Sequence, residues 1–350
     1  MNDAFADAVD RVGGFIDYDY RIGGNVVRLR FAGKALVRTI TRAFGHLACS
    51  SAGEPDLVIR LWDSRSTGRP LPLLVSTLIR LLRTTWLTDR GLRGEILEYN
   101  SQRMRAALHG HESNMLSLID LDERSGIFWV DQESDIPWYE AGAPLRTLLY
   151  WWFARHGRQM VHGGAIGTAA GGLLLGGKGS SGKSTTALAS LGSCLRYAGD
   201  DYTLVSTEPE PFVYSLYSTA KVKGSADFAR FPWMASGICN GDRIGPEGEK
   251  PMLFLHEHQP DKIISGFPLK AIVLPRYIAG TEKCKVIPVA PESALKAIAQ
   301  STITQLTGAG GEALRGMSEL VHRLPCYLVG LGEDLAEIPN VMIELLAKHA

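Results

Sequence analysis

The order of hydrophobic and polar residues predicts mixed α and β structure in the first 140 residues. Strand-like alternation or a short apolar run predicts strands at Asn25–Phe31, Asp56–Trp62, Glu95–Tyr99 and Gly126–Val130. Helical spacing of apolar residues predicts helices at Lys34–Leu47 and Pro72–Arg83. We therefore expect an N-terminal α+β domain over residues 1–140, with a role in substrate recognition or regulation.

After this region, predicted strands and helices alternate along the chain. The predicted strands are Met160–Thr168, Leu173–Gly176, Leu195–Ala198, Tyr202–Val205, Pro211–Leu216, Leu269–Leu274, Lys285–Val289 and Cys326–Val329. The predicted helices are Ala143–Arg155, Ser184–Leu191, Pro291–Thr302, Glu312–Arg323 and Leu335–Ala347. Such alternation is typical of an α/β layer fold, so we expect a second domain over residues 141–350.

Residues 177–184 carry the strongest chemical motif of the chain. They read Gly-Lys-Gly-Ser-Ser-Gly-Lys-Ser and match the phosphate-loop pattern G-x-x-x-x-G-K-[ST] between a predicted strand and a predicted helix. In such loops backbone N–H groups surround a phosphate, Lys183 reaches the β- and γ-phosphates, and the Ser184 hydroxyl binds Mg²⁺. We expect ATP and Mg²⁺ as ligands, with nucleotide contacts from Gly177, Gly179, Ser180, Ser181, Gly182, Lys183, Ser184 and Thr185.

An acidic pair, Asp200-Asp201, follows the predicted strand Leu195–Ala198. Strand ends beside a phosphate loop converge on the ligand, and adjacent residues of an extended segment point to opposite sides. One acid is therefore expected to bind Mg²⁺ and the other to accept the proton of an acceptor hydroxyl. His162 precedes the loop, and a core histidine is the alternative interpretation there. Gly163 and Gly164 beside it indicate the close approach of another group.

Together, His162-Gly163, the phosphate loop and Gly199-Asp200-Asp201 resemble the HPr kinase/phosphorylase family and, more distantly, ATP-dependent phosphoenolpyruvate carboxykinase. Lys183 lies 21 residues after His162 and 17 before Asp200, as in the HPr kinase family. The resemblance implies an HPr kinase-like phosphate-loop domain whose mixed sheet is flanked by helices. It also implies that Asp200 is the catalytic base, that His162 contacts that aspartate or the metal, and that Ser184 and Asp201 lie near Mg²⁺.

The function that the resemblance implies is an ATP-dependent kinase acting on a hydroxyl, with serine of a peptide or protein as the expected acceptor. Thr185 stands where HPr kinases carry an acidic residue, and their HPr-docking elements are not found, so HPr itself is not expected as substrate. Relatives of this kind include tailoring kinases of ribosomal peptides such as lasso peptides. Lys221 and Arg276 are candidate contacts to a phosphate or to the acceptor.

Two alternative functions stay open on the sequence. A small-molecule kinase shares every motif, because the phosphate machinery does not identify the acceptor. A nucleotide-dependent binding or scaffold protein shares the phosphate loop but has no use for a catalytic aspartate.

Charge and cysteine content restrict the partners and the compartment. Lys and Arg total 37, as do Asp and Glu, so the chain has none of the basic excess of a nucleic-acid wrapper or a polybasic membrane binder. Five cysteines without a C-x-x-C motif indicate a reducing compartment. Met1–Arg11 has no apolar core, and the apolar stretch near Ala143–Ala154 is too short for a membrane span. We expect a cytoplasmic protein without nucleic-acid or membrane partners; homo-oligomerisation stays open.

Overall fold

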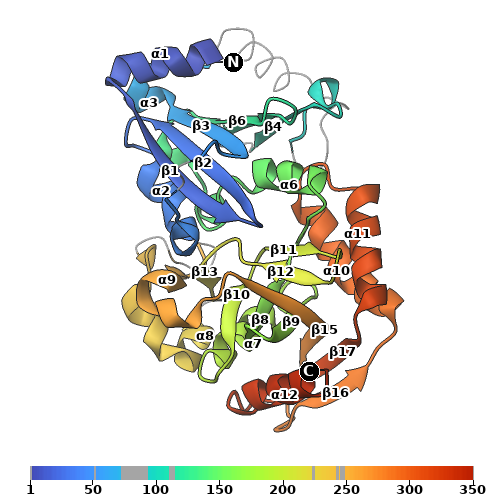
Figure 1. Cartoon of the computed structure of the whole chain (residues 1–350). Helices are drawn as coiled ribbons and strands as arrows, with labels where there is room; N and C mark the ends of the chain where they lie inside the picture. Colours follow the sequence, from blue (N-terminus) through green and yellow to red (C-terminus); the bar gives the residue numbers. More distant parts are fainter. Residues whose placement is uncertain are drawn as a thin grey trace. The chain divides into compact units, whose positions relative to one another are not determined.

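A computed structural model describes residues 2–50, 53–71, 94–109, 115–222, 225–241, 244 and 249–349. The chain divides into two compact units (Figure 1): unit 1 comprises Met1–Arg155 and Leu306–Gly308, and unit 2 comprises His156–Gln305 and Ala309–Ala350. Helix α6 (Arg146–Arg155) therefore belongs to unit 1, although the sequence analysis placed it in the second domain. The predicted helix Pro72–Arg83 lies outside the described residues.

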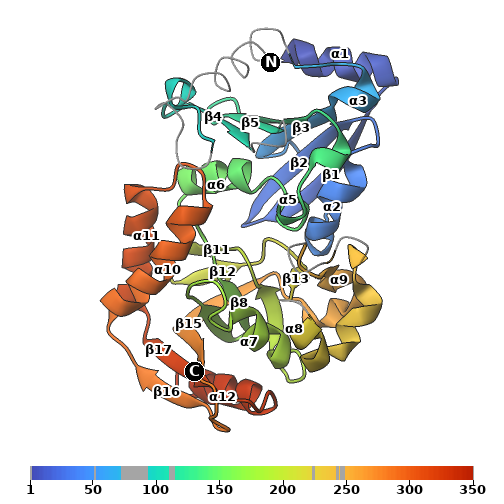
Figure 2. The same ribbon diagram turned by 180° about the vertical axis from the view of Figure 1, so that it is seen from behind.

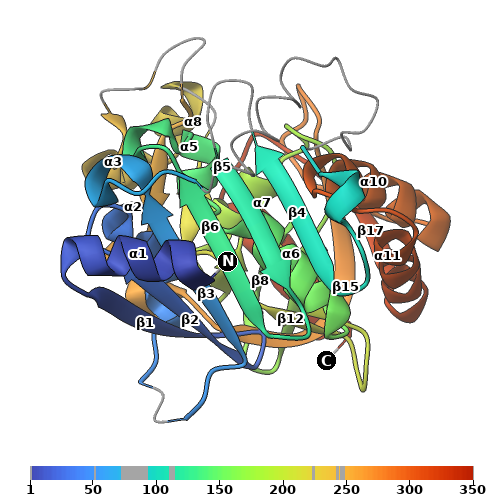
Figure 3. The ribbon, with the colours of Figure 1, turned by 90° about the horizontal axis from the view of Figure 1, so that it is seen from above.

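Unit 1 contains a six-stranded mixed sheet in the order β1-β2-β3-β6-β5-β4 (Figure 3). Its strands are β1 (Phe15–Ile22), β2 (Asn25–Ala32), β3 (Leu57–Asp63), β4 (Met104–His109), β5 (Met115–Asp120) and β6 (Ser125–Val130). Its other helical segments are α1 (Asn2–Val12), α2 (Val37–Thr41), η1 (Arg42–Leu47), α3 (Ser64–Thr67), η2 (Leu97–Tyr99), η3 (Glu133–Asp135) and α5 (Trp138–Ala141). Strands and helical segments both occur in this unit, in line with the mixed α and β structure that the sequence pattern predicted.

Alternation of side chains explains the packing of this sheet. On β2 the apolar Leu29 and Phe31 are buried, whereas Arg30 between them forms an ion pair with Asp17 of β1 at 2.7 Å. The paired residues Arg30 and Asp17 lie directly opposite each other in the β1–β2 register. Cross-strand pairs of opposite charge of this kind stabilise the register of antiparallel strands.

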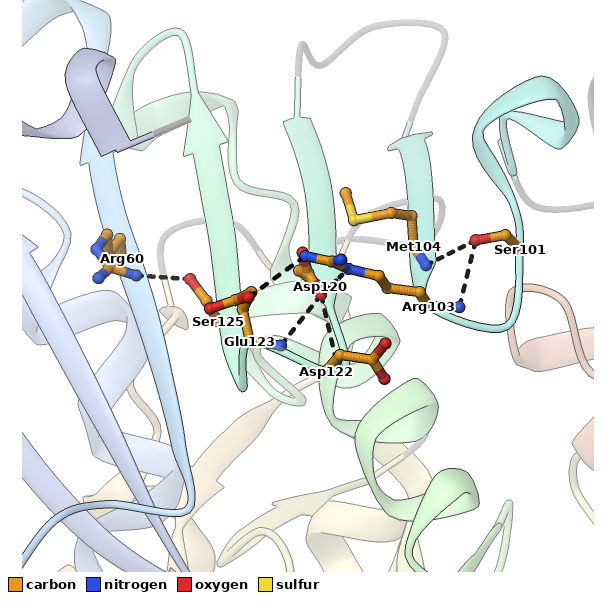
Figure 4. A network of polar contacts seen from close by, with 8 residues as sticks. All are labelled: Arg60, Ser101, Arg103, Met104, Asp120, Asp122, Glu123 and Ser125. Atoms are coloured by element: carbon orange, nitrogen blue, oxygen red, sulfur yellow. Dashed lines mark hydrogen bonds and ion pairs between the residues drawn. The ribbon is translucent and has the colours of Figure 1, made fainter.

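Polar contacts close the turn between β5 and β6 (Figure 4). Asp120 accepts a hydrogen bond from Arg103 at 2.8 Å and from the backbone N–H groups of Asp122 and Glu123 at 3.2 and 3.1 Å. The Arg103 contact, with these backbone donors, lowers the pKa of Asp120, so its carboxylate stays charged in the turn. These contacts shape the turn after β5 and connect the start of β4 with the end of β5.

Unit 2 contains a nine-stranded mixed sheet in the order β10-β8-β9-β15-β12-β11-β7, with β17 also pairing with β15 and β16. Its strands are β7 (Gln159–Val161), β8 (Gly164–Thr168), β9 (Gly171–Leu175), β10 (Arg196–Gly199), β11 (Thr203–Ser206), β12 (Phe212–Tyr214), β15 (Gly266–Tyr277), β16 (Lys285–Pro288) and β17 (Cys326–Leu331). A separate two-stranded ribbon consists of β13 (Thr219–Lys221) and β14 (Met252–Phe254). The helical segments are α7 (Lys183–Ser190), α8 (Ser225–Arg230), η4 (Pro232–Gly237), α9 (Leu255–His258), η6 (Pro260–Lys262), α10 (Pro291–Gln305), α11 (Gly311–Arg323) and α12 (Glu337–Ala347).

Helices cover both faces of this sheet (Figures 1 and 2). Leu173 and Leu175 of β9 pack with residues of α7 and α12, while Leu174 packs with residues of α10 and α11. An uninterrupted apolar run is what a strand buried on both faces requires. The α/β layers expected from the sequence, a mixed sheet flanked by helices, are therefore present in unit 2.

The sheet edge at the carboxyl end of β9 is where the phosphate loop begins. Strands β9, β15 and β17 run parallel to one another, so their carboxyl ends share this edge. In open α/β sheets this is the edge at which ligands bind. The strand topology therefore places the phosphate loop where binding is expected.

Three sequence predictions are wrong in detail. The single helix predicted at Lys34–Leu47 is a short α-helix, α2, followed by the 3-10 helix η1, and both begin after residue 36. The single strand predicted at Met160–Thr168 is two strands, because the chain turns at His162-Gly163 and then pairs with different neighbours. Glu95–Tyr99 was predicted as a strand, but it holds only isolated bridge residues at its start, such as Glu95 opposite Ala107, and a short 3-10 helix, η2, follows them.

Candidate functional site

The phosphate loop joins β9 to α7, and its last glycine sets the start of the helix. Gly182 is the N-cap of α7 with a φ of +110°, a conformation that side chains disfavour. A Cβ at this position would also lie 2.6 Å from the Cδ1 atom of Leu331 on β17. Glycine at 182 is therefore needed both for backbone conformation and for packing.

The side chain of Lys183 folds back over the loop. Its Nζ donates hydrogen bonds to the carbonyl oxygens of Gly177 at 2.7 Å and Lys178 at 3.1 Å. Burial lowers the pKa of Lys183, while the nearby charges of Asp200 and Asp201 oppose that shift. The ammonium group thus lies between the loop and the acid pair.

Asp200 is the buried member of the acid pair, with 4% of its surface exposed. Burial, followed by the charge of Asp201, raises the pKa of Asp200 to about 6, although a hydrogen bond with Ser184 and the charge of Lys183 act in the opposite direction. Among the described residues, Asp200 Oδ1 has no hydrogen-bond partner. The site therefore contains a buried carboxyl oxygen that is available to a proton or a cation.

Asp201 is held from both sides. Its Oδ1 lies 3.0 Å from His162 Nε2, and its Oδ2 accepts a hydrogen bond from Lys221 Nζ at 2.8 Å. Burial alone would raise the pKa of Asp201, but Lys221 and His162 together lower it well below the usual range. The resemblance implied that His162 contacts Asp200 or the metal; the carboxylate that its imidazole contacts in the structure is that of Asp201.

The two glycines after His162 allow β8 to approach the acid pair. A Cβ on Gly164 would lie 3.0 Å from the Gly199 oxygen and 3.2 Å from the Asp200 Cα, and one on Gly163 would lie 2.6 Å from the Leu175 oxygen. The close approach that these glycines predicted is confirmed. The approaching groups are the end of β10, where the acid pair begins, and the end of β9.

The remaining predicted residues have different positions. Lys221, predicted to contact a phosphate or the acceptor, is paired with Asp201. Arg276 is exposed at the end of β15, directly after Pro275, whose Cβ lies 3.7 Å from where a Gly182 Cβ would be. Three other loop residues differ in their surroundings. Ser180 has a positive φ, and the buried Ser181 hydroxyl has no hydrogen-bond partner among the described residues. A Cβ on Gly179 would meet no atom within 4 Å. Thr185 lies in the first turn of α7.

Sequence reasoning missed two residues near the site. The Tyr197 hydroxyl donates a hydrogen bond to the Thr219 carbonyl at 2.6 Å and so connects β10 to β13, the strand that carries Lys221. A tyrosine within an apolar strand gave no signal other than core packing. Lys250, whose charge acts on Lys183, lies in a stretch rich in Gly, Pro and charge that resembles an ordinary loop.

The donor set was tested against the expected Mg²⁺ ion. Within the described part of the chain no three His, Cys, Asp or Glu side chains form a metal cluster. Magnesium at a phosphate loop does not need one, because a hydroxyl, a carboxylate, phosphate oxygens and water complete its shell. The Ser184 hydroxyl and the charged carboxylate of Asp201 supply hard ligands of this kind beside the buried acid Asp200. The residues fit Mg²⁺ bound together with a nucleotide.

Comparison with known proteins gives a distant structural likeness. No family model matches the chain, and neither does any curated protein. Among solved structures, the Hpr(Ser) kinase/phosphatase from Coxiella burnetii is 11% identical to this chain, covers 55% of it and 95% of its own length, and has a TM-score of 0.28. A likeness of this extent assigns neither activity nor substrate, so the roles of the site residues depend on their own geometry.

Among the described residues, no helix has both the length and the apolar character that crossing a bilayer requires.

Proposed function

We propose that this chain is an ATP-dependent kinase that transfers the γ-phosphoryl group to a hydroxyl, with serine of a peptide or protein as the acceptor. The observation that carries the proposal is the buried carboxyl group of Asp200, whose Oδ1 has no hydrogen-bond partner among the described residues and whose pKa responds to Ser184 and Lys183 of the phosphate loop. A protein that only binds a nucleotide has no need of a buried carboxyl group such as that of Asp200 beside the phosphate loop. A kinase needs one to accept the acceptor proton.

In the proposed mechanism the loop amides and Lys183 bind the β- and γ-phosphates. Mg²⁺, held by the Ser184 hydroxyl and an aspartate of the pair, would neutralise phosphate charge when bound. Asp200 Oδ1 accepts the proton of the acceptor hydroxyl as the hydroxyl oxygen bonds to phosphorus and the bond from phosphorus to ADP breaks. A pKa of about 6 suits a base that works near neutral pH.

The second aspartate has a different role in this proposal. His162 and Lys221 hold both oxygens of Asp201 and keep it charged. Two adjacent carboxylates disfavour the ionisation of each other, so a fixed charge on one raises the pKa of the other. Asp201 thus contributes to the proton affinity of Asp200, in addition to any contact with the metal.

The test is mass-spectrometric detection of a phosphorylated product with MgATP and candidate acceptors, beginning with ribosomally made peptide precursors. Asp200→Asn is expected to reduce transfer by at least about a hundredfold, the usual contribution of a general base, while nucleotide binding is retained. Asp261→Asn, an exposed acid of the same unit, serves as the matched control and is expected to keep full activity.

Other outcomes have distinct meanings. Full activity of the Asp200→Asn protein would disprove the base assignment. Phosphorylation of small hydroxyl compounds but of no peptide would identify a small-molecule kinase. Nucleotide binding without transfer to any acceptor would favour a nucleotide-dependent binding protein.

A further inference from the structure

The strand beside β9 in the sheet ends in an exposed tyrosine. Tyr277 is the last residue of β15 and keeps 44% of its surface exposed. Strand β15 runs parallel to β9, which leads into the phosphate loop, so the tyrosine lies at the sheet edge where ligands bind. An aromatic ring exposed at that edge is accessible to a ligand.

The strand register places this ring on the face of the sheet that α7 covers. Side chains alternate along a strand, so Tyr277 shares its face with Val273, which packs with residues of α7, and with Pro275. Pro275 Cβ is 3.7 Å from the position of a Cβ on Gly182, the N-cap of α7. Leu331 of β17, which pairs with Tyr277, has its Cδ1 atom 2.6 Å from that position. The ring therefore lies beside the start of α7, one residue pair beyond Pro275.

The acid pair and Tyr277 lie on opposite sides of the phosphate loop. The strand order β10-β8-β9-β15 puts β9, and the loop that follows it, between the ends of β10 and β15. Asp200 and Asp201 follow β10, whereas Tyr277 ends β15. In the proposed reaction the terminal phosphoryl group faces Asp200. The nucleoside part of a nucleotide bound to the loop amides then extends away from the acid pair, toward β15 and β17.

A guanidinium group borders the ring. The Cζ atom of Arg230, at the end of α8, lies 5.6 Å from the centre of the Tyr277 ring. This distance is within the range of a cation–π contact, which favours one orientation of the ring. Phe231, next to Arg230, packs in the same core cluster as Leu331 and residues of α7. An aromatic ring and a guanidinium plane are the two kinds of group on which nucleobases stack.

We propose that Tyr277 binds the nucleobase of the donor nucleotide by stacking, with Arg230 beside it, and that the site prefers purine to pyrimidine nucleotides. An aromatic ring binds a base through its flat face, and the gain grows with the apolar area that is buried. A purine has two fused rings and a pyrimidine has one. The inference rests on the proposed function and adds to it the residue that holds the nucleoside part of the donor.

Calorimetric titration of the full chain with MgADP, and with magnesium tripolyphosphate as a ligand without a base, tests the assignment. Tyr277→Ala is expected to weaken MgADP about five- to a hundredfold, the range for removal of a stacked aromatic, and to change tripolyphosphate affinity less than about twofold. Tyr277→Phe keeps the ring and should bind MgADP nearly as tightly as wild type. MgCDP should bind wild type more weakly than MgADP does, and Tyr277→Ala should reduce that difference.

A second tyrosine of the same unit supplies the matched control. Tyr214 also has a guanidinium over its ring, with Arg158 Cζ 5.4 Å from the ring centre. It pairs with Gly266, the first residue of β15, and so lies at the opposite edge of the sheet from Tyr277. Tyr214→Ala is expected to leave the affinities for MgADP and tripolyphosphate as in wild type. Thermal unfolding of each variant checks that it is folded at the temperature of the titration.

The outcomes separate this inference from the proposed function. If Tyr277→Ala binds MgADP as tightly as wild type, or loses MgADP and tripolyphosphate equally, the assignment of Tyr277 is wrong while the kinase proposal stands. A wild-type chain that binds MgCDP as tightly as MgADP would overturn the purine preference. If the wild-type chain binds neither MgADP nor tripolyphosphate, both proposals fail. The expected affinities without transfer to any acceptor would overturn the kinase proposal alone.

Discussion

Asp200 and Asp201 are neighbours in the chain with opposite electrostatic surroundings. Asp201 has a cationic or imidazole partner at each oxygen, whereas Asp200 has a hydroxyl partner and an oxygen without one. The consequence is one acid that stays charged and one whose protonation changes near neutral pH. Opposed surroundings of this kind often mark a pair with divided catalytic roles.

Burial of Asp200 has a cost in stability that depends on pH. Its pKa in the folded chain, about 6, lies above the ordinary value of 3.8, so the folded state binds the proton more tightly than the unfolded state. The destabilisation is complete above about pH 6 and disappears as the pH falls through 3.8. Asp200→Asn removes it and is expected to raise the unfolding free energy at pH 8 by up to roughly 3 kcal/mol.

The measurement is chemical unfolding of the metal-free, nucleotide-free protein at pH 8 and pH 4.5. We expect the difference between Asp200→Asn and wild type to shrink at the lower pH. Asp261→Asn should show no difference at either pH, since this side chain is exposed. A variant less stable than wild type at pH 8 would show that the ionised Asp200 stabilises the fold.

The sequence predicted which residues gather at this site, but not every contact among them. Motif spacing placed His162, the phosphate loop and the acid pair in one region, and the structure brings them together. The sequence does not decide whether the His162 imidazole contacts Asp200 or Asp201. The turn after β10 decides it, because neighbouring residues point in different directions. The Lys221–Asp201 pair is equally non-local, since it requires the separate ribbon that carries Lys221.

At the scale of elements, the best predictions came from segments with a single strong pattern. The apolar run of β9 and the regular spacing in α10 and α11 place those elements close to their predicted bounds. Strand β1 was not predicted, although its residues alternate between apolar and polar from Ile16 to Ile22; several of them are exposed. The division of Met160–Thr168 into β7 and β8 was also beyond the sequence pattern, because both halves are apolar and only their pairing partners differ.

The junction between the phosphate loop and α7 gives a prediction about an element. Gly182→Ala introduces a side chain at a φ of +110° and against Leu331. We expect a loss of about 1–3 kcal/mol in unfolding free energy from backbone strain, and a loss of nucleotide affinity because the loop shifts. Thermal unfolding and titration with MgADP measure the two effects.

Gly179 in the same loop provides the control. A Cβ there meets no atom within 4 Å, and its φ is not positive. Gly179→Ala is therefore expected to keep the unfolding free energy of the wild type. Equal losses of unfolding free energy for Gly182→Ala and Gly179→Ala would mean that these substitutions act through loop flexibility and not through the backbone conformation of Gly182.

At the scale of the molecule, unit 1 is not continuous in sequence. Leu306–Gly308 follow α10 of unit 2 yet belong to unit 1, where Leu306 is 2% exposed. The Trp151 Nε1 atom of α6 donates to the Thr307 carbonyl at 3.0 Å. These three residues thus complete the packing of a unit whose other residues all precede residue 156.

This discontinuity predicts a remote effect of a small substitution. Leu306→Ala is expected to lower the unfolding free energy of unit 1 by about 2–5 kcal/mol, the range for truncating a buried leucine. Among the tryptophans of the described residues, only Trp233 lies outside unit 1, so their fluorescence reports mainly on that unit. Affinity for MgADP, a property of unit 2, should stay unchanged in native buffer; a parallel loss of both would show that the two units unfold together.

The same discontinuity affects how such a protein can evolve. A single recombination event near codon 155 would exchange the first 155 residues of unit 1 but leave the old Leu306–Gly308 in place. The incoming segment would then have to pack against a Leu306 from a different gene, and its α6 against the Thr307 carbonyl of that gene. Exchange of unit 1 between genes thus requires either a second crossover around codon 306 or compatible residues there, so its inheritance is linked to that of the phosphate-loop unit.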